Sequence, residues 1–228
     1  MSSHFVVHGG TPVSGTIRPA GNKNAALPIL TATFLCEEPV TLENVPRIGD
    51  VETMVALLAD LGAEIEWTGA NTLEIDTRNG QSKALNPDLC ARIRASILLA
   101  GPLLARFGRV VLPPPGGDVI GRRRIDTHLL ALEHMGTEVD VGDRYELRTK
   151  KLTGEDIFLD EPCVTGTENA LMAAVAAEGR TVLRNAASEP HVQDLARMLV
   201  AMGARIEGIG TNTYVVEGGG LLKGGTYT

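Results

Sequence analysis

The hydrophobic and polar positions of the chain follow one pattern three times, at intervals of about 70 residues. Each copy predicts a helix rich in Ala and Leu, a strand, a loop, an amphipathic helix and then two strands of alternating polarity. The copies span residues 24–76, 90–148 and 168–218. Equivalent strand positions are occupied by Leu42, Leu112 and Leu183. The pattern predicts an α/β fold built from three pseudo-symmetric units.

The two kinds of helix in each copy differ in how their apolar residues are distributed. In the second helix of the first copy, apolar residues recur at helical spacing from Val51 to Leu61. A glycine follows the second helix in every copy, where a C-terminal cap is expected: Gly62, Gly136 and Gly203. The first helices are apolar nearly all round, so we expect them to be buried. The three units therefore predict one domain with helices inside and sheets outside.

The two ends of the chain do not fit the repeat. Residues 1–20 predict two short strands around a Gly-Gly turn, with no helix of their own. Residues 219–228 are rich in glycine and begin a strand that has no visible partner. We expect residues 21–218 to form the three-unit lobe and both ends to be strands of something larger. The alternative is that the two ends pair with each other.

Composition and charge narrow the class of protein. The formal net charge is −7 and the pI is about 5.3, which argues against general binding to nucleic acid or to an anionic membrane. The most apolar stretches, around 25–35 and 95–105, are too short to span a bilayer. The N-terminus has no secretion signal, so we expect a cytoplasmic protein. Cys36, Cys90 and Cys163 lack metal-ligand spacing, so we expect reduced thiols and no metal site.

Three segments carry residues suited to binding an anion. Residues 21–24 open the first buried helix and place Lys23 where free backbone N–H groups favour an anion. The alternative is a capping turn with Lys23 in solvent. The loop 112–126 is the longest connection among the repeats, and its arginines 122–124 suit a phosphate or carboxylate clamp. The alternative for such a charge run is solvated surface.

Two further features lie at the starts of the first helices of the second and third copies. Arg94 interrupts an apolar stretch, so it must reach solvent, pair with an acid or face a ligand. Polar residues 165–169 begin the helix of the third copy, where capping is the simpler interpretation.

Several motifs, in order along the whole chain, resemble the enolpyruvyl transferase family and in particular its members that act on UDP-N-acetylglucosamine. They are GNKNAALPIL, RASILLAGPLLARFG, PGGDVIGRRRIDTH, TGTENALMAA and EPHVQDLARMLVAMGA. The resemblance implies an inside-out α/β barrel lobe, one of two lobes with the active site between them. It also implies transfer of the enolpyruvyl group of phosphoenolpyruvate to the 3-hydroxyl of the sugar nucleotide, with release of phosphate and without a metal or organic cofactor. This reaction is the first committed step of peptidoglycan synthesis.

The resemblance implies roles for individual residues. The catalytic residues that it implies are Asp118, Lys23 and Arg123. The substrate-binding residues that it implies are Lys23, Asn24, Arg94, Arg123, Arg124, Ile125, Asp126, Thr127, Val164 and Thr165. Asp118 stands where the family usually has a catalytic cysteine, and a carboxylic acid there can protonate the methylene carbon of phosphoenolpyruvate. Without the thiolate that fosfomycin alkylates, resistance to that drug is expected.

The sequence departs from the family at some positions and in length. Leu98 replaces a common tryptophan, Arg124 a common proline, and Glu161 a residue that is basic in some members. Members of the family are about twice as long, as their two-lobed architecture requires. The other lobe is then expected from a longer chain or from a second polypeptide. Two alternatives remain: a 5-enolpyruvylshikimate-3-phosphate synthase-like transferase, and a non-catalytic module that binds a UDP-sugar.

Overall fold

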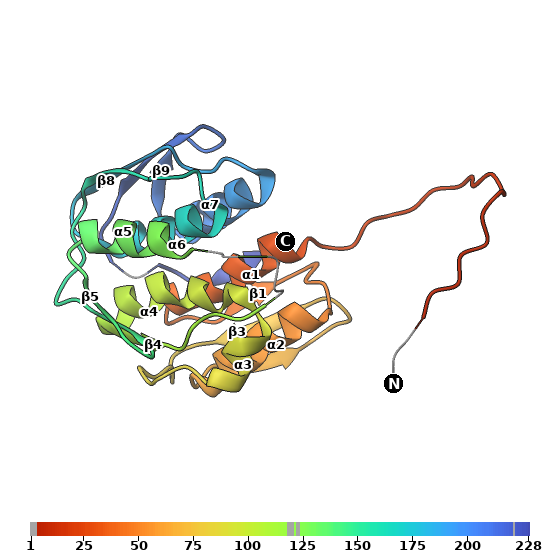
Figure 1. Cartoon of the computed structure of the whole chain (residues 1–228), viewed down its shortest axis with the longest axis horizontal. Helices are drawn as coiled ribbons and strands as arrows, with labels where there is room; N and C mark the ends of the chain where they lie inside the picture. The colour runs from red at the N-terminus through yellow and green to blue at the C-terminus, as the bar shows by residue number, and fades with distance from the viewer. Residues whose placement is uncertain (1–3, 118–120, 122–123, 221) are drawn as a thin grey trace.

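The computed structural model of the chain describes residues 4–117, 121, 124–220 and 222–228. Helices and short strands alternate along the described residues, which gives a mixed α/β protein as the sequence pattern predicts (Figure 1). Asp118 and Arg123, both predicted to be catalytic, lie outside the described residues.

The described residues form three sheets, and each sheet contains a set of three antiparallel strands with one connectivity. In each sheet the last of the three strands lies in the middle, paired on both sides. The three sets are β1 (Val40–Leu42), β3 (Leu73–Asp76) and β2 (Glu64–Trp67); β4 (Arg109–Leu112), β6 (Tyr145–Arg148) and β5 (Glu138–Val141); and β8 (Arg180–Arg184), β10 (Thr213–Glu217) and β9 (Arg205–Glu207). The three leucines at equivalent strand positions are all buried, as expected for a side facing the core.

The first strand of each set has a parallel neighbour, which for two of the sets comes from the preceding part of the chain. β7 (Asp156–Phe158) pairs with β8, and Ala84 forms a parallel bridge to Val111 in β4. At β1 the parallel neighbour is β11 (Gly225–Tyr227), from the far end of the described chain. The expectation that the C-terminal segment lacks a partner within the chain is therefore wrong for β11. Its pairing with β1 joins the third unit back to the first.

The first helix of each unit lies in the core. These helices are α1 (Lys23–Ala32), α4 (Ala100–Phe107) and α6 (Val164–Ala176). Residues 25–32 of α1 and 166–175 of α6 are all buried, which matches their apolar composition. Short 3₁₀ turns adjoin two of them: η1 (Thr33–Leu35) follows α1, and η2 (Arg94–Leu99) precedes α4. α6 packs against α4 and α1, so the three units share one core.

The second helix of each unit is amphipathic and ends near a glycine, as predicted. These helices are α2 (Gly49–Asp60), α5 (Asp126–His134) and α7 (Pro190–Ala201); a short α3 (Pro87–Arg92) lies before η2. The backbone φ angles are +95° at Gly62, +89° at Gly136 and +106° at Gly203. Side chains with a Cβ atom rarely adopt such values, so glycine ends each helix without strain.

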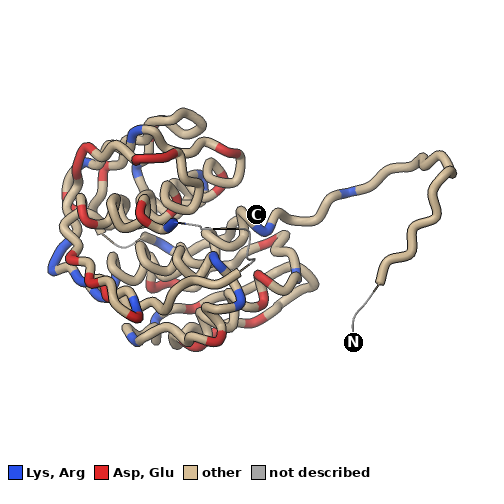
Figure 2. Tube along the Cα trace, in the orientation of Figure 1, with Lys and Arg blue, Asp and Glu red and all other residues tan. Residues whose placement is uncertain are grey.

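The N-terminal segment, residues 4–22, contains no helix or strand in the structure. It extends away from the rest of the chain (Figure 1) and carries few charges (Figure 2). Phe5 and Val13 are each 97% exposed and Ile17 is 90% exposed. The two expected strands do not form within the described residues. A strand needs a neighbour for its backbone hydrogen bonds, so their pairing with another lobe stays a prediction.

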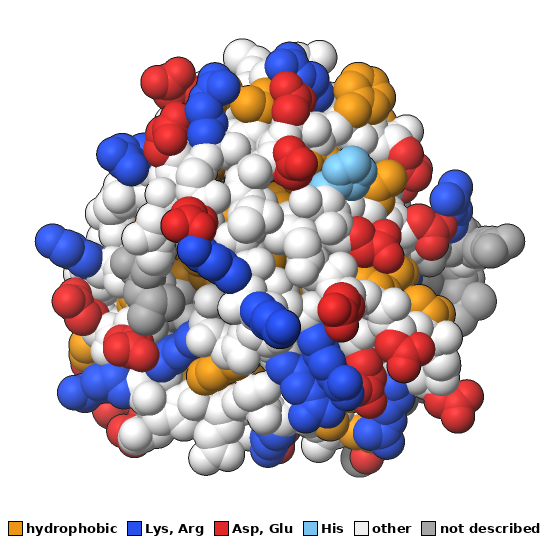
Figure 3. All heavy atoms as spheres, turned by 90° about the vertical axis from the view of Figure 1, so that its left-hand side faces the viewer, with side chains coloured by type: hydrophobic (Ala, Val, Ile, Leu, Met, Phe, Trp, Pro, Cys, Tyr) orange, Lys and Arg blue, Asp and Glu red, His pale blue; other side chains and the backbone are white. Residues whose placement is uncertain are grey.

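The surface carries charges of both signs. On the face shown in Figure 3, Lys and Arg side chains are interspersed with Asp and Glu. Ion pairs such as Arg184 with Asp156 and Arg148 with Glu146 join neighbouring positions of the sheets. Within the described ranges, no helix combines the length and the apolar character needed to cross a bilayer.

Candidate active site

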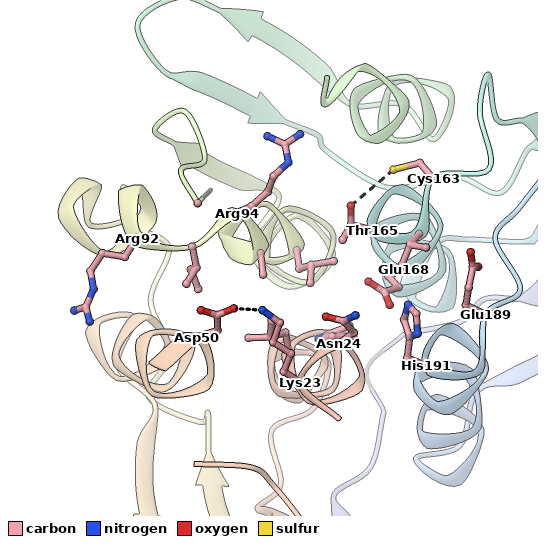
Figure 4. Close-up of a pocket in the computed structure, with 17 residues that line it drawn as sticks. Lys23, Asn24, Asp50, Arg92, Arg94, Cys163, Thr165, Glu168, Glu189 and His191 are labelled. Carbon is pink, nitrogen blue, oxygen red and sulfur yellow. Dashed lines mark hydrogen bonds and ion pairs between the residues drawn. The ribbon is translucent and has the colours of Figure 1, made fainter. Parts of the chain in front are cut away.

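A cavity of about 510 Å³ opens where the N-terminal ends of α1, α2, α6 and α7 meet the turn between α3 and η2. Its wall includes side chains from all three units, which lie around one space (Figure 4). The lining residues are Lys23, Asn24, Leu27, Pro28, Asp50, Arg92, Ile93, Arg94, Ala95, Leu98, Gly117, Cys163, Val164, Thr165, Glu168, Glu189 and His191. Apolar walls with a few converging polar groups are typical of small-molecule sites.

Lys23 is the first residue of α1 and faces this cavity. Asn22 caps the helix, because its side-chain oxygen accepts a hydrogen bond from the backbone N–H of Asn24 at 2.7 Å. The Lys23 ammonium Nζ lies 2.6 Å from the carboxylate Oδ2 of Asp50 on α2. Both side chains are about half exposed, so the pair contributes little to stability and water or a ligand can reach it. The turn is thus a capping turn that also presents a cation.

Arg94 begins η2 and links the cavity to the long loop after β4. Its guanidinium Nη2 donates a hydrogen bond to the backbone carbonyl of Arg124 at 2.7 Å. The start of the same loop is held to α3, because the N–H groups of Gly116 and Gly117 donate to the carbonyls of Cys90 and Ala91. Gly117 lines the cavity. The described parts of the loop on both sides of Asp118 therefore lie beside the cavity.

The N-terminus of α6 forms another wall. Val164 and Thr165 are in its first turn, where backbone N–H groups have no acceptor inside the helix. No acidic residue lies in that turn, so the end of the helix favours an anion. The side-chain cap is Cys163, whose Sγ accepts a hydrogen bond from the N–H of Gly166 at 3.3 Å. Capping by the polar residues 165–169, the simpler interpretation of the sequence, is therefore wrong.

Those polar residues instead connect α6 to its neighbours. The Thr167 hydroxyl accepts a hydrogen bond from the N–H of Ala187. The Asn169 amide Nδ2 donates to the carbonyl of Ile97, and its Oδ1 accepts from the N–H of Gly101 at 2.7 Å. These bonds fix the orientation of the Asn169 amide and attach α6 to the second unit.

The fixed amide determines the tautomer of His128 on α5. Asn169 Nδ2 lies 2.9 Å from His128 Nδ1 and must donate to it, so Nδ1 is the acceptor. The ring proton is then on Nε2, which donates to the hydroxyl of Thr165 at 3.1 Å. Burial, and to a smaller extent the charge of Arg94, lowers the pKa of His128 to about 3, so the ring is neutral. Thr165 keeps its own proton to donate to Cys163 or into the cavity.

Two carboxyl groups lie on the side of the cavity near α7. Glu168 on α6 is 1% exposed, and its Oε1 has no hydrogen-bond partner among the described residues. Burial, followed by the negative charge of Glu189, raises the pKa of the Glu168 carboxyl well above its ordinary value. Glu189 precedes Pro190 at the start of α7. His191 and Asn24 lie near Glu168 in the same part of the cavity (Figure 4).

The structure brings five of the predicted site residues around the cavity: Lys23, Asn24, Arg94, Val164 and Thr165. Four others form a neighbouring segment at the start of α5. Of these, Ile125 and Thr127 are buried, and the Thr127 hydroxyl donates to the carboxylate of Asp160 at 2.6 Å. Arg124 and Asp126 form an exposed ion pair with each other. Neither pair appears in the cavity wall, although Arg94 contacts the backbone of Arg124.

Sequence reasoning assigned no role to several residues of the wall. They are Asp50, Cys163, Glu168, Glu189 and His191. Asp50 and Glu189 lie at helix starts, where acidic residues are common for reasons of helix stability alone. Glu168 lies in a run of helix-start residues but is followed by the apolar run ALMAAVAA. The signal in the sequence is a carboxyl just before the apolar part of a helix that the pattern predicts to be buried.

Comparisons with known proteins agree on the family. A family model described as EPSP synthase (3-phosphoshikimate 1-carboxyvinyltransferase) matches residues 7–228. The UDP-N-acetylglucosamine 1-carboxyvinyltransferase of Bradyrhizobium diazoefficiens is 64% identical over 98% of this chain and 52% of its own length. That of Treponema denticola is 52% identical over 96% of this chain and 52% of its own length. The chain therefore spans about half the length of the curated relatives it matches.

Solved structures share the fold. The enolpyruvyl transferase NikO from Streptomyces tendae superposes with a TM-score of 0.82 at 26% identity, over 96% of this chain and 52% of that one. EPSP synthase from Acinetobacter baumannii superposes with a TM-score of 0.73 at 20% identity, over 93% of this chain and 48% of that one, and indicates the fold alone. The motifs, the fold and the matched range agree: this chain belongs to the EPSP synthase (3-phosphoshikimate 1-carboxyvinyltransferase) family, a family of enolpyruvyl transferases.

Proposed function

We propose that this protein forms one half of an enzyme that transfers the enolpyruvyl group of phosphoenolpyruvate to the 3-hydroxyl of UDP-N-acetylglucosamine, with release of phosphate. The observation that carries the proposal is the convergence of Lys23, Asn24, Arg94, Val164 and Thr165, from all three units, on one cavity. The resemblance independently implies a substrate contact for each of these residues. The enzyme is a cytoplasmic enzyme of cell-wall synthesis.

The positive groups of the cavity suit the two anionic substrates. Lys23 contacts phosphoenolpyruvate, and Asn24 lies beside it at the sugar nucleotide. The first turn of α6, at Val164 and Thr165, approaches the diphosphate with backbone N–H groups, as helix N-termini do. Thr165 adds a hydroxyl proton, because His128 already donates to its oxygen.

The remaining roles follow from the resemblance. The segment Arg123 to Thr127 holds the uridine end. Asp118 protonates the methylene carbon of phosphoenolpyruvate, and Arg123 is the arginine that contacts the substrates beside it. No metal or organic cofactor takes part. Since a carboxylate is a far poorer nucleophile than a thiolate, the enzyme resists alkylation by fosfomycin.

A second lobe completes the site. The present lobe is an inside-out α/β barrel of three pseudo-symmetric repeats, and residues 1–20 supply strands to the other lobe. The exposed apolar side chains of Phe5, Val13 and Ile17 support this, because they gain a buried face only against another surface. Residues 219–228 lead to that lobe, which comes from a longer chain or from a second polypeptide.

The specific relatives favour the sugar nucleotide over shikimate-3-phosphate as the acceptor. The two UDP-N-acetylglucosamine 1-carboxyvinyltransferases named above are 64% and 52% identical to this chain, whereas EPSP synthase of Acinetobacter baumannii is 20% identical. The chain also retains Lys23, Arg94, Asp118 and Arg123, which supports an enzyme over a module that only binds a UDP-sugar. An assay of turnover separates the two.

An assay of phosphate release from phosphoenolpyruvate tests the proposal. The chain is measured alone and with the purified C-terminal half of the Bradyrhizobium diazoefficiens relative, with either UDP-N-acetylglucosamine or shikimate-3-phosphate as acceptor. We expect no turnover alone, because one wall of the site is absent, and turnover with the added half and UDP-N-acetylglucosamine only. Preference for shikimate-3-phosphate contradicts the proposal. Sugar-nucleotide binding by a folded, complemented protein without turnover supports the binding module instead.

A further inference from the structure

The carboxyl group of Glu168 is the feature of the cavity that the proposed roles leave unexplained. It lies in the helix α6, is 1% exposed, and its Oε1 is without a hydrogen-bond partner in the described part of the chain. The buried hydroxyls of Thr137 and Thr181 also lack a hydrogen-bond partner among the described residues. Of these three residues, only Glu168 lines the cavity. A buried polar atom without a partner lowers stability, so its presence at a binding site points to a partner supplied by a ligand.

The position of Glu168 on α6 relates it to the expected diphosphate. Glu168 follows Thr165 by three residues, so the two side chains share a face of the helix on consecutive turns. One turn of helix advances by about 5.4 Å. A ligand with its phosphates at the first turn therefore places the group attached to them beside Glu168. Asn24 and His191 border the same space from α1 and α7 (Figure 4).

The charges around Glu168 indicate what kind of group it binds. The cations Lys23 and Arg94 line other parts of the wall, where they suit phosphate and carboxylate groups. Beside Glu168 lies the acidic Glu189, whose charge disfavours a second anion there. The raised pKa of Glu168 favours its neutral form, which offers one O–H donor and an acceptor oxygen. A hydroxyl group of the ligand is uncharged and can both donate to and accept from the neutral carboxyl group.

We infer that Glu168 is a specificity-determining contact for the sugar ring of the nucleotide and hydrogen-bonds one of its hydroxyl groups. This assignment rests on the proposed function, which supplies the sugar nucleotide. The nucleoside end lies at the start of α5, the diphosphate at the first turn of α6, and the sugar one turn further along α6.

The test measures the affinity of UDP-N-acetylglucosamine and of UDP by isothermal titration calorimetry. Glu168→Met keeps a side chain of similar length without hydrogen-bonding groups, whereas Glu168→Gln keeps a neutral donor and acceptor. We expect Glu168→Met to weaken the affinity for UDP-N-acetylglucosamine about tenfold. The affinity for UDP should stay within about twofold of wild type. Glu168→Gln should bind both UDP-N-acetylglucosamine and UDP with affinities within about threefold of wild type. Thr181→Val, the control, removes an unpartnered buried hydroxyl away from the cavity and changes neither affinity.

Thermal unfolding without ligand is the second measurement. Removal of the unpaired carboxyl in Glu168→Met raises the melting temperature, so the same change stabilises the fold and weakens sugar recognition. If Glu168→Met keeps the wild-type preference for UDP-N-acetylglucosamine over UDP, or weakens both ligands equally, Glu168 is not a sugar contact. If wild type binds neither nucleotide, the proposed function is refuted, and the proposed sugar contact is refuted with it. If wild type binds both equally, the sugar contact alone is refuted.

Discussion

The carboxylate of Asp50 lies 2.6 Å from the ammonium group of Lys23, the residue proposed to contact phosphoenolpyruvate. Phosphoenolpyruvate must therefore compete with Asp50 for this cation. We expect Asp50→Asn, in the complete two-lobed enzyme, to lower the KM for phosphoenolpyruvate about two- to fivefold, because a half-exposed ion pair contributes up to about 1 kcal/mol. Steady-state kinetics measure the change.

A neighbouring ion pair on the same helix provides the control for Asp50. Glu52 pairs with Arg47 at 3.1 Å, is similarly exposed and does not line the cavity. Glu52→Gln should leave the KM unchanged. A higher KM in Asp50→Asn would mean that the carboxylate holds Lys23 in its working position rather than competing for it.

The buried, neutral His128 predicts loss of stability in acid. Its folded pKa is about 3, and an unfolded histidine has a pKa of about 6.5. The unfolded chain therefore binds the proton first, and the stability present above pH 6.5 falls by about 1.4 kcal/mol per pH unit as pH drops toward 3. His128→Gln lacks this contribution. Urea unfolding at several pH values should show the stability of wild type falling relative to His128→Gln across this window.

Substitution of His134 separates this effect from the general effect of acid. His134 ends the same helix but is exposed. His134→Gln should retain the fall in stability that the buried ring of His128 causes. A constant difference between wild type and His128→Gln from pH 7 to pH 4 would contradict a neutral buried ring.

Asp118 predicts how the complete enzyme responds to fosfomycin. The carboxylate serves as a general acid but is a poor nucleophile toward an epoxide, so wild type should remain active after prolonged exposure. Asp118→Cys should keep turnover and gain time-dependent inactivation, detected as a covalent adduct by mass spectrometry. Asp118→Asn should lose most activity, because an amide has no acidic proton. Rapid alkylation of wild type, or full activity of Asp118→Asn, would refute the role.

Two of the helix-ending glycines predict different costs for the same substitution. Gly203→Ala places a Cβ in open space, so only the positive φ opposes it, at about 1–2 kcal/mol. Gly62→Ala adds a Cβ 2.6 Å from the backbone carbonyl oxygen of Asn79, which must move. We expect Gly62→Ala to cost at least about 1 kcal/mol more in chemical unfolding. Equal costs would mean that the backbone at Asn79 yields freely.

Local patterns predicted the elements of the fold better than their long-range partners. The helical spacing from Val51 to Leu61 and the glycine that follows are written in adjacent residues, and both are confirmed. The partner of β11 is not encoded in adjacent residues. Thr228 donates to Glu43, 185 residues earlier, and no local pattern marks such a pairing. Residues 4–22 have the composition of strands, but a strand forms only where a neighbour completes it.

The candidate site was predictable where a charge breaks an apolar pattern. Arg94 stands out in this way, and Lys23 stands out because it opens a buried helix; both line the cavity. Glu168 does not, because polar residues at a helix start usually cap it. Here the thiol of Cys163 makes the cap, which leaves the carboxyl of Glu168 to face the cavity. Which side chain caps a helix depends on backbone geometry that the sequence does not reveal.

The pairing of β11 with β1 sets an order of events during synthesis. The ribosome releases β1 long before β11, because about 180 residues separate them. At about 5–20 residues per second, the edge of β1 stays without its neighbour for about 10–40 s. Unpaired strand edges attract other chains. The nascent lobe is therefore most exposed to misassembly at its oldest sheet, until its last strand leaves the exit tunnel.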